Sequence, residues 1–245
     1  MNAPSTPITI AFRIPGKWSH PKELVENLPD GCRLTGEKFV LPDATEVDFA
    51  AMGADDQFAE IFRSSCRNPA TADEMAKVDS YAVNILMSGP GGSMASAHAM
   101  MRAAAAIVRA GGAGVFIDNS AVAHGGGQWL DMTEDGGPDA LSFAFVAIVR
   151  GRTEVYTIGM HILGLRDIVM KRSDIESQGF DIVEVIRYVA RGEKPIDDGH
   201  VLANLDGPQF QVFTQECDKQ LAGTPMHNPF GRLKLVSLRD VAETN

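Results

Sequence analysis

One short segment of the sequence combines residue types that can carry out chemistry. Residues 86–95 read LMSGPGGSMA, a glycine-rich turn between an apolar, strand-like segment and a helical pattern. Such a turn can hold a phosphate with its backbone N–H groups, or present a nucleophilic serine at a strand-to-helix elbow. A third interpretation needs no ligand, because Ser93 can cap the following helix while the glycines serve the tight turn.

The phosphate-binding interpretation fits this segment poorly. The P-loop pattern G-x-x-x-x-G-K-[ST] requires a lysine, and none follows Gly92. The dinucleotide pattern G-x-G-x-x-G needs a glycine where the helix approaches the strand, and Met94 occupies that position. We therefore predict that Ser93 is a helix cap and that Gly91 and Gly92 serve the turn. Anion binding by free N–H groups is the alternative.

A serine hydrolase is also a weak match. Residues 91–95 (GGSMA) come within one residue of G-x-S-x-G, and residues 124–127 (HGGG) imitate an oxyanion loop. In α/β-hydrolases, however, the glycine loop precedes the nucleophile, whereas here it follows. We assign no catalytic residue. The candidate ligand-binding residues are Ser93, His124 and Gln128, because glycines next to His124 allow backbone to approach a ligand closely.

The sequence contains no pattern that indicates a metal or cofactor. The histidines form neither H-x-x-x-H nor H-E-x-x-H, and His98 lies on the apolar stripe of a helical pattern. The three cysteines, Cys32, Cys66 and Cys217, are widely spaced and form no C-x-x-C pair. We predict no metal site, no cofactor and no disulfide framework.

Charge and hydropathy exclude two classes of partner. The chain of 245 residues has 22 Lys and Arg against 32 Asp and Glu, a net charge of −10, which disfavours nucleic acid. The N-terminus lacks the basic start and apolar core of a signal peptide, and the longest apolar run is far shorter than a membrane span. We expect a cytoplasmic protein with no nucleic-acid or membrane partner.

The first half of the sequence alternates strand and helix patterns. Strands are predicted at residues 8–14, 58–62, 81–87 and 113–117, with a hairpin from KFVL and EVDF at residues 38–49. A helix follows Pro21, a capping box at Thr71 predicts another over residues 74–78, and apolar steps of three and four predict a third over residues 93–110.

The second half contains more strands than helices. A linker is predicted at residues 133–139, then strands at 141–149 and 154–163, a helix at 180–191, a hairpin from HVLANL and QFQVF, and a last strand from RLKLVSL. The frequency of hairpins predicts an α+β fold with an antiparallel-rich sheet, helices packed on one face, and two ferredoxin-like halves. The predicted division is 1–132 and 140–245.

The C-terminal half carries a recognisable motif from residue 154 onward. A tyrosine-threonine strand leads into G-x-x-x-x-G, an acidic residue and an apolar helix, at Tyr156, Thr157, Gly159, Gly164 and Asp167. This segment resembles the uncharacterised domain-of-unknown-function family 4261 over about a fifth of the chain. It departs from the family at Leu165 and Arg166, where a Lys-Pro pair is usual. The resemblance implies a fold and no catalytic activity.

Two function classes fit these observations. The first is a non-catalytic binding or regulatory domain, of the adaptor or bacterial immunity type, that binds another protein or itself as a homodimer. The second is a small-molecule enzyme or ligand sensor that uses the loops of Ser93 and His124. A pocket bounded by Ser93, His124 and Gln128 would favour the second class, and an extended apolar surface would favour the first.

Overall fold

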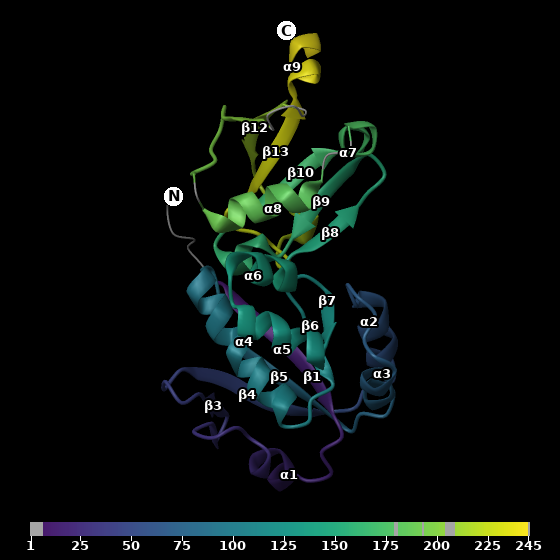
Figure 1. Ribbon diagram of the computed structural model, residues 1–245, viewed down its shortest axis with the longest axis vertical. Helices are drawn as coiled ribbons and strands as arrows, with labels where there is room; N and C mark the ends of the chain where they lie inside the picture. Colours follow the sequence, from purple (N-terminus) through teal and green to yellow (C-terminus); the bar gives the residue numbers. More distant parts are fainter. Residues whose placement is uncertain (1–6, 179–180, 193, 204–208, 245) are drawn as a thin grey trace.

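The computed structural model describes residues 7–178, 181–192, 194–203 and 209–244 and has two sheets stacked along its long axis, with α6 between them (Figure 1). The first sheet has the order β2–β3–β4–β5–β1–β6–β7, and all its neighbouring strands are antiparallel. Its strands are β1 (Thr9–Gly16), β2 (Arg33–Thr35), β3 (Lys38–Val40), β4 (Glu46–Gly53), β5 (Val83–Pro90), β6 (Gly114–Ile117) and β7 (Val122–Gly125).

The second sheet has the order β11–β12–β13–β10–β9–β8. Its one parallel pair, among the described strands, joins β10 directly to β13. The strands are β8 (Ala147–Arg150), β9 (Glu154–Ile158), β10 (Asp167–Lys171), β11 (Val201–Ala203), β12 (Gln209–Gln215) and β13 (Arg232–Ser237). These two sheets confirm the predicted α+β class and its antiparallel character. The predicted turn at residues 206–208, between β11 and β12, lies outside the described residues.

Nine helices are assigned in the described residues: α1 (Pro21–Glu26), α2 (Phe58–Ser65), α3 (Ala72–Asp79), α4 (Met94–Arg109), α5 (Gly126–Asp135), α6 (Pro138–Phe145), α7 (Arg172–Gln178), α8 (Ile182–Arg191) and α9 (Leu238–Thr244). The predicted helices at residues 93–110 and 180–191 are confirmed as α4 and α8. The predicted capping box is also present, because Thr71 and Glu74 each bond the other's backbone N–H. No described helix has the length and apolar character required to cross a bilayer.

The main helix layer covers one face of the first sheet. Ile10, Phe12 and Ile14 alternate along β1 and are fully buried in the same core as the alanine-rich face of α4. The split unit β5–α4–β6 places β1 between two mutually parallel strands, an arrangement typical of ferredoxin-like folds. The second sheet is built differently, because its parallel strands β10 and β13 are direct neighbours.

A smaller helix layer lies on the opposite face of the first sheet, so the prediction that the helices pack on one face is wrong for this sheet. Phe58 and Phe62 of α2 pack with Phe116 of β6 in a separate cluster that also includes α3 residues. The predicted strand at 58–62 is therefore wrong. The two phenylalanines are four residues apart, a spacing that places both on one side of a helix.

The predicted linker at residues 133–139 and strand at 141–149 are also wrong. Helix α5 extends to Asp135, left-handed Gly136 ends it, and Pro138 opens α6 at a position that favours proline. The run LSFAF then completes α6, and strand β8 begins only at Ala147. A short apolar run suits a buried helix as well as a strand, so its periodicity did not discriminate between them.

Aromatic contacts join the two halves of the chain. Phe12 lies with its ring centroid 5.5 Å from that of Trp129 and 6.0 Å from that of Phe145. All three belong to one core cluster that also contains residues of the second sheet. The division into residues 1–132 and 140–245 stays a prediction.

Candidate functional site

The glycine-rich segment that contains Ser93 is a packing junction between the two halves. Ser93 caps α4, because its Oγ accepts a hydrogen bond of 3.1 Å from the Ser96 N–H. The Gly91 N–H donates to the Ile8 carbonyl, and the Gly92 N–H donates to the Ile162 carbonyl of the second half. The cap predicted for Ser93 is confirmed, and these two N–H groups already have partners within the chain.

Gly164, in the second half of the chain, packs tightly against this junction. Gly164 has a φ of +79°, and a Cβ built there would lie 2.4 Å from the backbone oxygen of Gly92. Such a distance is shorter than any real contact of this kind, so only glycine allows the two backbones to approach. This close contact gives a structural role to a glycine of the motif that resembles family 4261.

His124 is fully buried in β7 and both of its ring nitrogens have partners. Nε2–H donates to the Ala144 carbonyl at 2.9 Å, and Nδ1 lies 3.1 Å from the side-chain amide of Gln128. Desolvation by burial lowers the pKa of His124, so the ring is neutral at neutral pH. The predicted proximity of His124 and Gln128 is therefore observed, but as a buried hydrogen-bonded pair.

The glycine run after His124 accommodates a side chain of the protein itself. The Gly127 N–H donates to Glu74 Oε1 at 2.8 Å, and a Cβ on Gly125 would lie 2.5 Å from the other carboxylate oxygen of Glu74. The N-terminus of α5, which favours an anion, thus receives the carboxylate of Glu74. None of the hydrogen bonds of the described residues joins Ser93 to His124 or Gln128.

A second buried polar cluster lies in the other sheet, around Asp167 at the start of β10. Asp167 is only 2% exposed, and it accepts hydrogen bonds from Asn228 Nδ2 (2.9 Å), Thr157 Oγ1 (3.2 Å) and the Met160 N–H (3.3 Å). Among the described residues no cation pairs with it. Burial raises the pKa of Asp167 to about 7, while its hydrogen bonds oppose that shift.

The sequence indicated only part of this cluster. Thr157 and Asp167 belong to the motif quoted above, and the structure places them in direct contact. Asn228 lies in the loop before β13, and no local sequence pattern indicates that its side chain reaches β10. That loop also forms a wall of a pocket of about 530 Å³, lined in part by Arg166, Cys217 and His227.

A larger groove of about 790 Å³ lies between α8 and the edge strand β11. Its apolar wall consists of Val185, Tyr188, Ile196 and Leu202, and its other lining residues are Glu184, Arg191, Lys194, Pro195, His200, Val201 and Ala203. Val201 on this edge strand is 52% exposed. The groove combines an apolar surface with a strand edge that can accept another strand.

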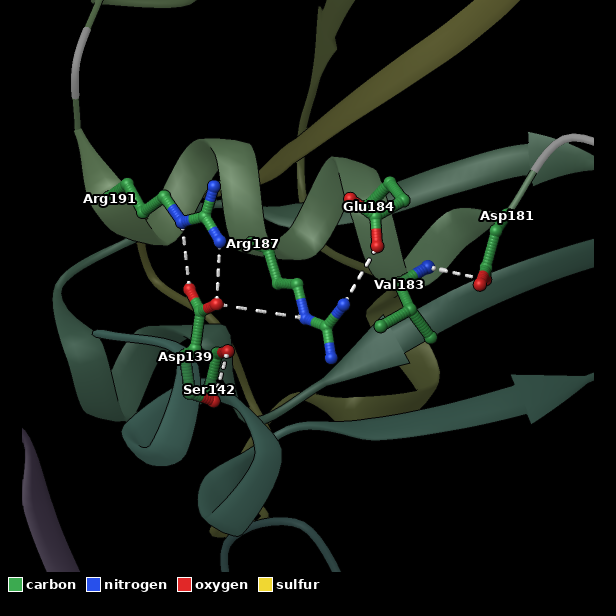
Figure 2. A network of polar contacts seen from close by, with 7 residues as sticks. All are labelled: Asp139, Ser142, Asp181, Val183, Glu184, Arg187 and Arg191. Atoms are coloured by element: carbon green, nitrogen blue, oxygen red, sulfur yellow. Dashed lines mark hydrogen bonds and ion pairs between the residues drawn. The ribbon is translucent and has the colours of Figure 1, made fainter. Parts of the chain in front are cut away.

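Ion pairs fix the helix that forms one side of this groove. Asp139 in the first turn of α6 accepts two hydrogen bonds from Arg191, at 2.9 and 2.6 Å, and its carboxylate lies 3.9 Å from Arg187 (Figure 2). Arg187 also donates to Glu184 at 2.8 Å, and Asp181 caps the helix through the Val183 N–H. These contacts tie α8 to α6 along one side. Hydrogen bonds from Arg191 hold the pKa of Asp139 below its usual value.

No group of three or more potential metal ligands comes together among the described residues. Neither a protein-family model, a curated protein nor a solved structure matches the chain. The resemblance to family 4261 therefore stays a prediction, and the functional argument depends on the geometry described above.

Proposed function

We propose that this protein is a non-catalytic binding protein that recognises an extended segment of a partner polypeptide in the groove between α8 and β11. The observation that carries the proposal is the combination of an apolar groove with a sheet edge. The edge strand offers backbone groups for pairing, while the groove offers Tyr188, Ile196 and Leu202 to alternate side chains of the bound strand.

The surroundings of the groove support a polypeptide ligand. Helix α8 buries Ile182, Ile186 and Val189 in the core, so one wall of the groove is in place before binding. A pre-organised wall lowers the entropic cost of binding. The charged residues that line the groove are Arg191 and Lys194 against Glu184, which leaves the lining positive on a chain of net charge −10 and favours acidic residues next to the apolar ones in the partner.

The alternative, an enzyme or sensor at the loops of Ser93 and His124, has less support. Ser93 caps a helix, His124 is buried with two partners, and the glycines beside each are required by close packing. These residue types therefore have structural roles that account for their positions. A regulatory or adaptor role through the groove remains the better proposal.

The experiment that tests the proposal uses peptides selected from a random displayed library on the wild-type protein. Peptides with alternating apolar residues and acidic neighbours should be enriched. Val201→Lys should weaken their binding at least tenfold, because the substitution places a charge in the groove. Val25→Lys is the matched control, because Val25 lies on α1 and is 49% exposed, close to the 52% of Val201.

Three outcomes would contradict the proposal. Selected peptides could bind the Val201→Lys and Val25→Lys proteins equally well. The wild-type protein could form a dimer in sedimentation that Val201→Lys abolishes, in which case a second copy occupies the groove. Turnover of an ester or phosphate substrate that is lost in Ser93→Ala would contradict the non-catalytic part.

A further inference from the structure

The buried carboxyl of Asp167 contacts the middle of a loop through one side chain, that of Asn228. Asn228, which is fully buried, donates from Nδ2 to Asp167 Oδ2 (2.9 Å) and to the Leu165 carbonyl (3.0 Å). Its own Oδ1 accepts from the Phe230 N–H at 2.9 Å, and its backbone N–H donates to Cys217 Sγ at 3.4 Å. The loop of residues 224–231 is thus built around the amide that contacts Asp167.

This loop forms one wall of the open pocket that Arg166 and Cys217 line. Its other hydrogen bonds to the rest of the chain lie toward its two ends: the Pro225 carbonyl accepts from Asn119 and from His161, the Phe230 carbonyl accepts from Arg166, and the Gly231 carbonyl accepts from the Asp167 N–H. Separating Asn228 from Asp167 would therefore release the middle of the loop and admit water to the carboxyl.

We infer that the Asp167 carboxyl is a proton-operated latch: its neutral form keeps the loop of residues 224–231 packed against the start of β10, and loss of the proton favours opening of the loop. An ionised carboxylate in this site has been removed from water without a cation in contact, which is costly. Opening the loop returns water to the carboxylate, so ionisation and opening reinforce each other.

The charged and titratable groups around Asp167 do not remove the free-energy cost of burying its ionised carboxylate. Arg232 of β13 attracts Asp167 electrostatically, but it is paired with Asp218 at 3.3 Å. Arg166, next to Asp167 in sequence, is paired with Asp197 at 3.0 Å. His161 is buried, and desolvation lowers its pKa to about 4, so it is neutral where Asp167 titrates.

His227 and Cys217 complete the surroundings on the loop side. His227 lines the pocket, and one of its ring nitrogens, Nδ1, is buried without a partner among the described residues. Cys217 contributes the sulfur that accepts from the Asn228 N–H. The pKa of Asp167 is about 7 in the closed structure and is near the ordinary value once hydrated. The opening equilibrium should then rise close to tenfold per pH unit below about pH 7 and level off above it.

Hydrogen exchange followed by mass spectrometry, corrected for the intrinsic pH dependence of exchange, tests the inference on the full chain. Protection of residues 226–231 should fall close to tenfold per pH unit between about pH 5 and 7 in the wild type. The hairpin of β2 and β3 serves as the internal control, because its local opening leaves Asp167 buried. In Asp167→Asn, the pH dependence of the loop should disappear.

Two further measurements keep the result interpretable. Asn228→Ala keeps the carboxyl but removes the tie, so the loop should lose its protection at every pH. Direct titration of the Asp167 carboxyl carbon by NMR in the wild type covers the case in which the variants fail to fold. A titration midpoint below about pH 5, a loop that follows the hairpin control, or pH dependence retained in Asp167→Asn would each overturn the latch.

Discussion

A buried polar side chain has a different role in each of the two sheets. His124 in the first sheet and Asp167 in the second are almost equally buried, at 0% and 2% exposure. Burial shifts both pKa values toward the neutral form, downward for the imidazole and upward for the carboxyl. The lowered pKa of the histidine favours its neutral form at neutral pH, whereas the pKa of the aspartate, about 7, lies where its charge changes near neutral pH. The first sheet uses its polar group for structure, and the second retains one that can respond to pH.

The largest expected effect is on the second sheet. The neutral carboxyl of Asp167 stabilises the fold fully below about pH 4, and this contribution is lost as the pH rises through the folded-state pKa of about 7. Because asparagine does not ionise, the unfolding free energy of Asp167→Asn minus that of the wild type should increase by about 4 kcal/mol between these limits. Urea denaturation at a series of pH values measures it.

The wild type must be compared with Asp167→Asn because two buried histidines change the unfolding free energy with pH in the direction opposite to Asp167. His124 and His161 have lowered pKa values, so their stabilising contributions are lost as the pH falls below about 6.5. They are present in both proteins and cancel in the difference. A difference that stays constant from about pH 4 to 7 would show that Asp167 is ionised in the fold.

The second largest effect is expected at His124, the buried histidine of the first sheet. His124→Ala should lower the free energy of unfolding by about 3 kcal/mol, because it creates a cavity beside Trp129 and Phe143 and leaves the Ala144 carbonyl without its donor. Gln128→Ala, which removes one partner, should cost about 1 kcal/mol. Equal stability of His124→Ala and the wild type would contradict a structural role.

The third effect is at the junction between the sheets. Gly164→Ala should cost about 2 kcal/mol, because the new Cβ meets the backbone of Gly92. Gly36→Ala is the matched control, because Gly36 also has a positive φ, of +62°, but no atom within 4 Å of the added Cβ. Its cost should be about 1 kcal/mol, from backbone strain. Thermal and urea unfolding of both variants measure these losses of unfolding free energy. Equal losses for Gly164→Ala and Gly36→Ala would contradict close packing at Gly164.

The smallest effect is at the cap of α4. Ser93→Ala should lower stability by about 1 kcal/mol, and Ser93→Gly by a few tenths. Melting curves with and without phosphate separate a cap from an anion site. The cap predicts that phosphate raises the melting temperature of wild type and Ser93→Ala by the same amount, and stabilisation of the wild type alone would contradict it.

Local signals in the sequence account for much of the fold. The apolar steps of α4, the capping box at Thr71 and the glycine after Arg191 each specify a helix boundary or face within a few residues. Two short segments, residues 58–62 and 141–149, were assigned wrongly. Their apolar residues fit either a strand or a buried helix, and only packing against neighbouring elements decides between them.

The candidate sites could be predicted much less well. Glu74 reaches Gly127 across 53 residues, and Asn228 reaches Asp167 across 61, so no local pattern signals either contact. The groove depends on where α8 packs relative to β11. Serine, histidine and glycine in suggestive patterns are also the residues that cap helices and permit close packing, and here they have those structural roles.

The position of β1 has a consequence for how the protein is made. This strand is synthesised before its partners in the centre of the sheet, β5 and β6, with Thr9 opposite Pro90 and Phe12 opposite Ile117. Until those residues emerge, Ile10, Phe12 and Ile14 have no native surface to cover them. We therefore expect the nascent chain to be prone to aggregation during early synthesis, and the first sheet to form late and slowly.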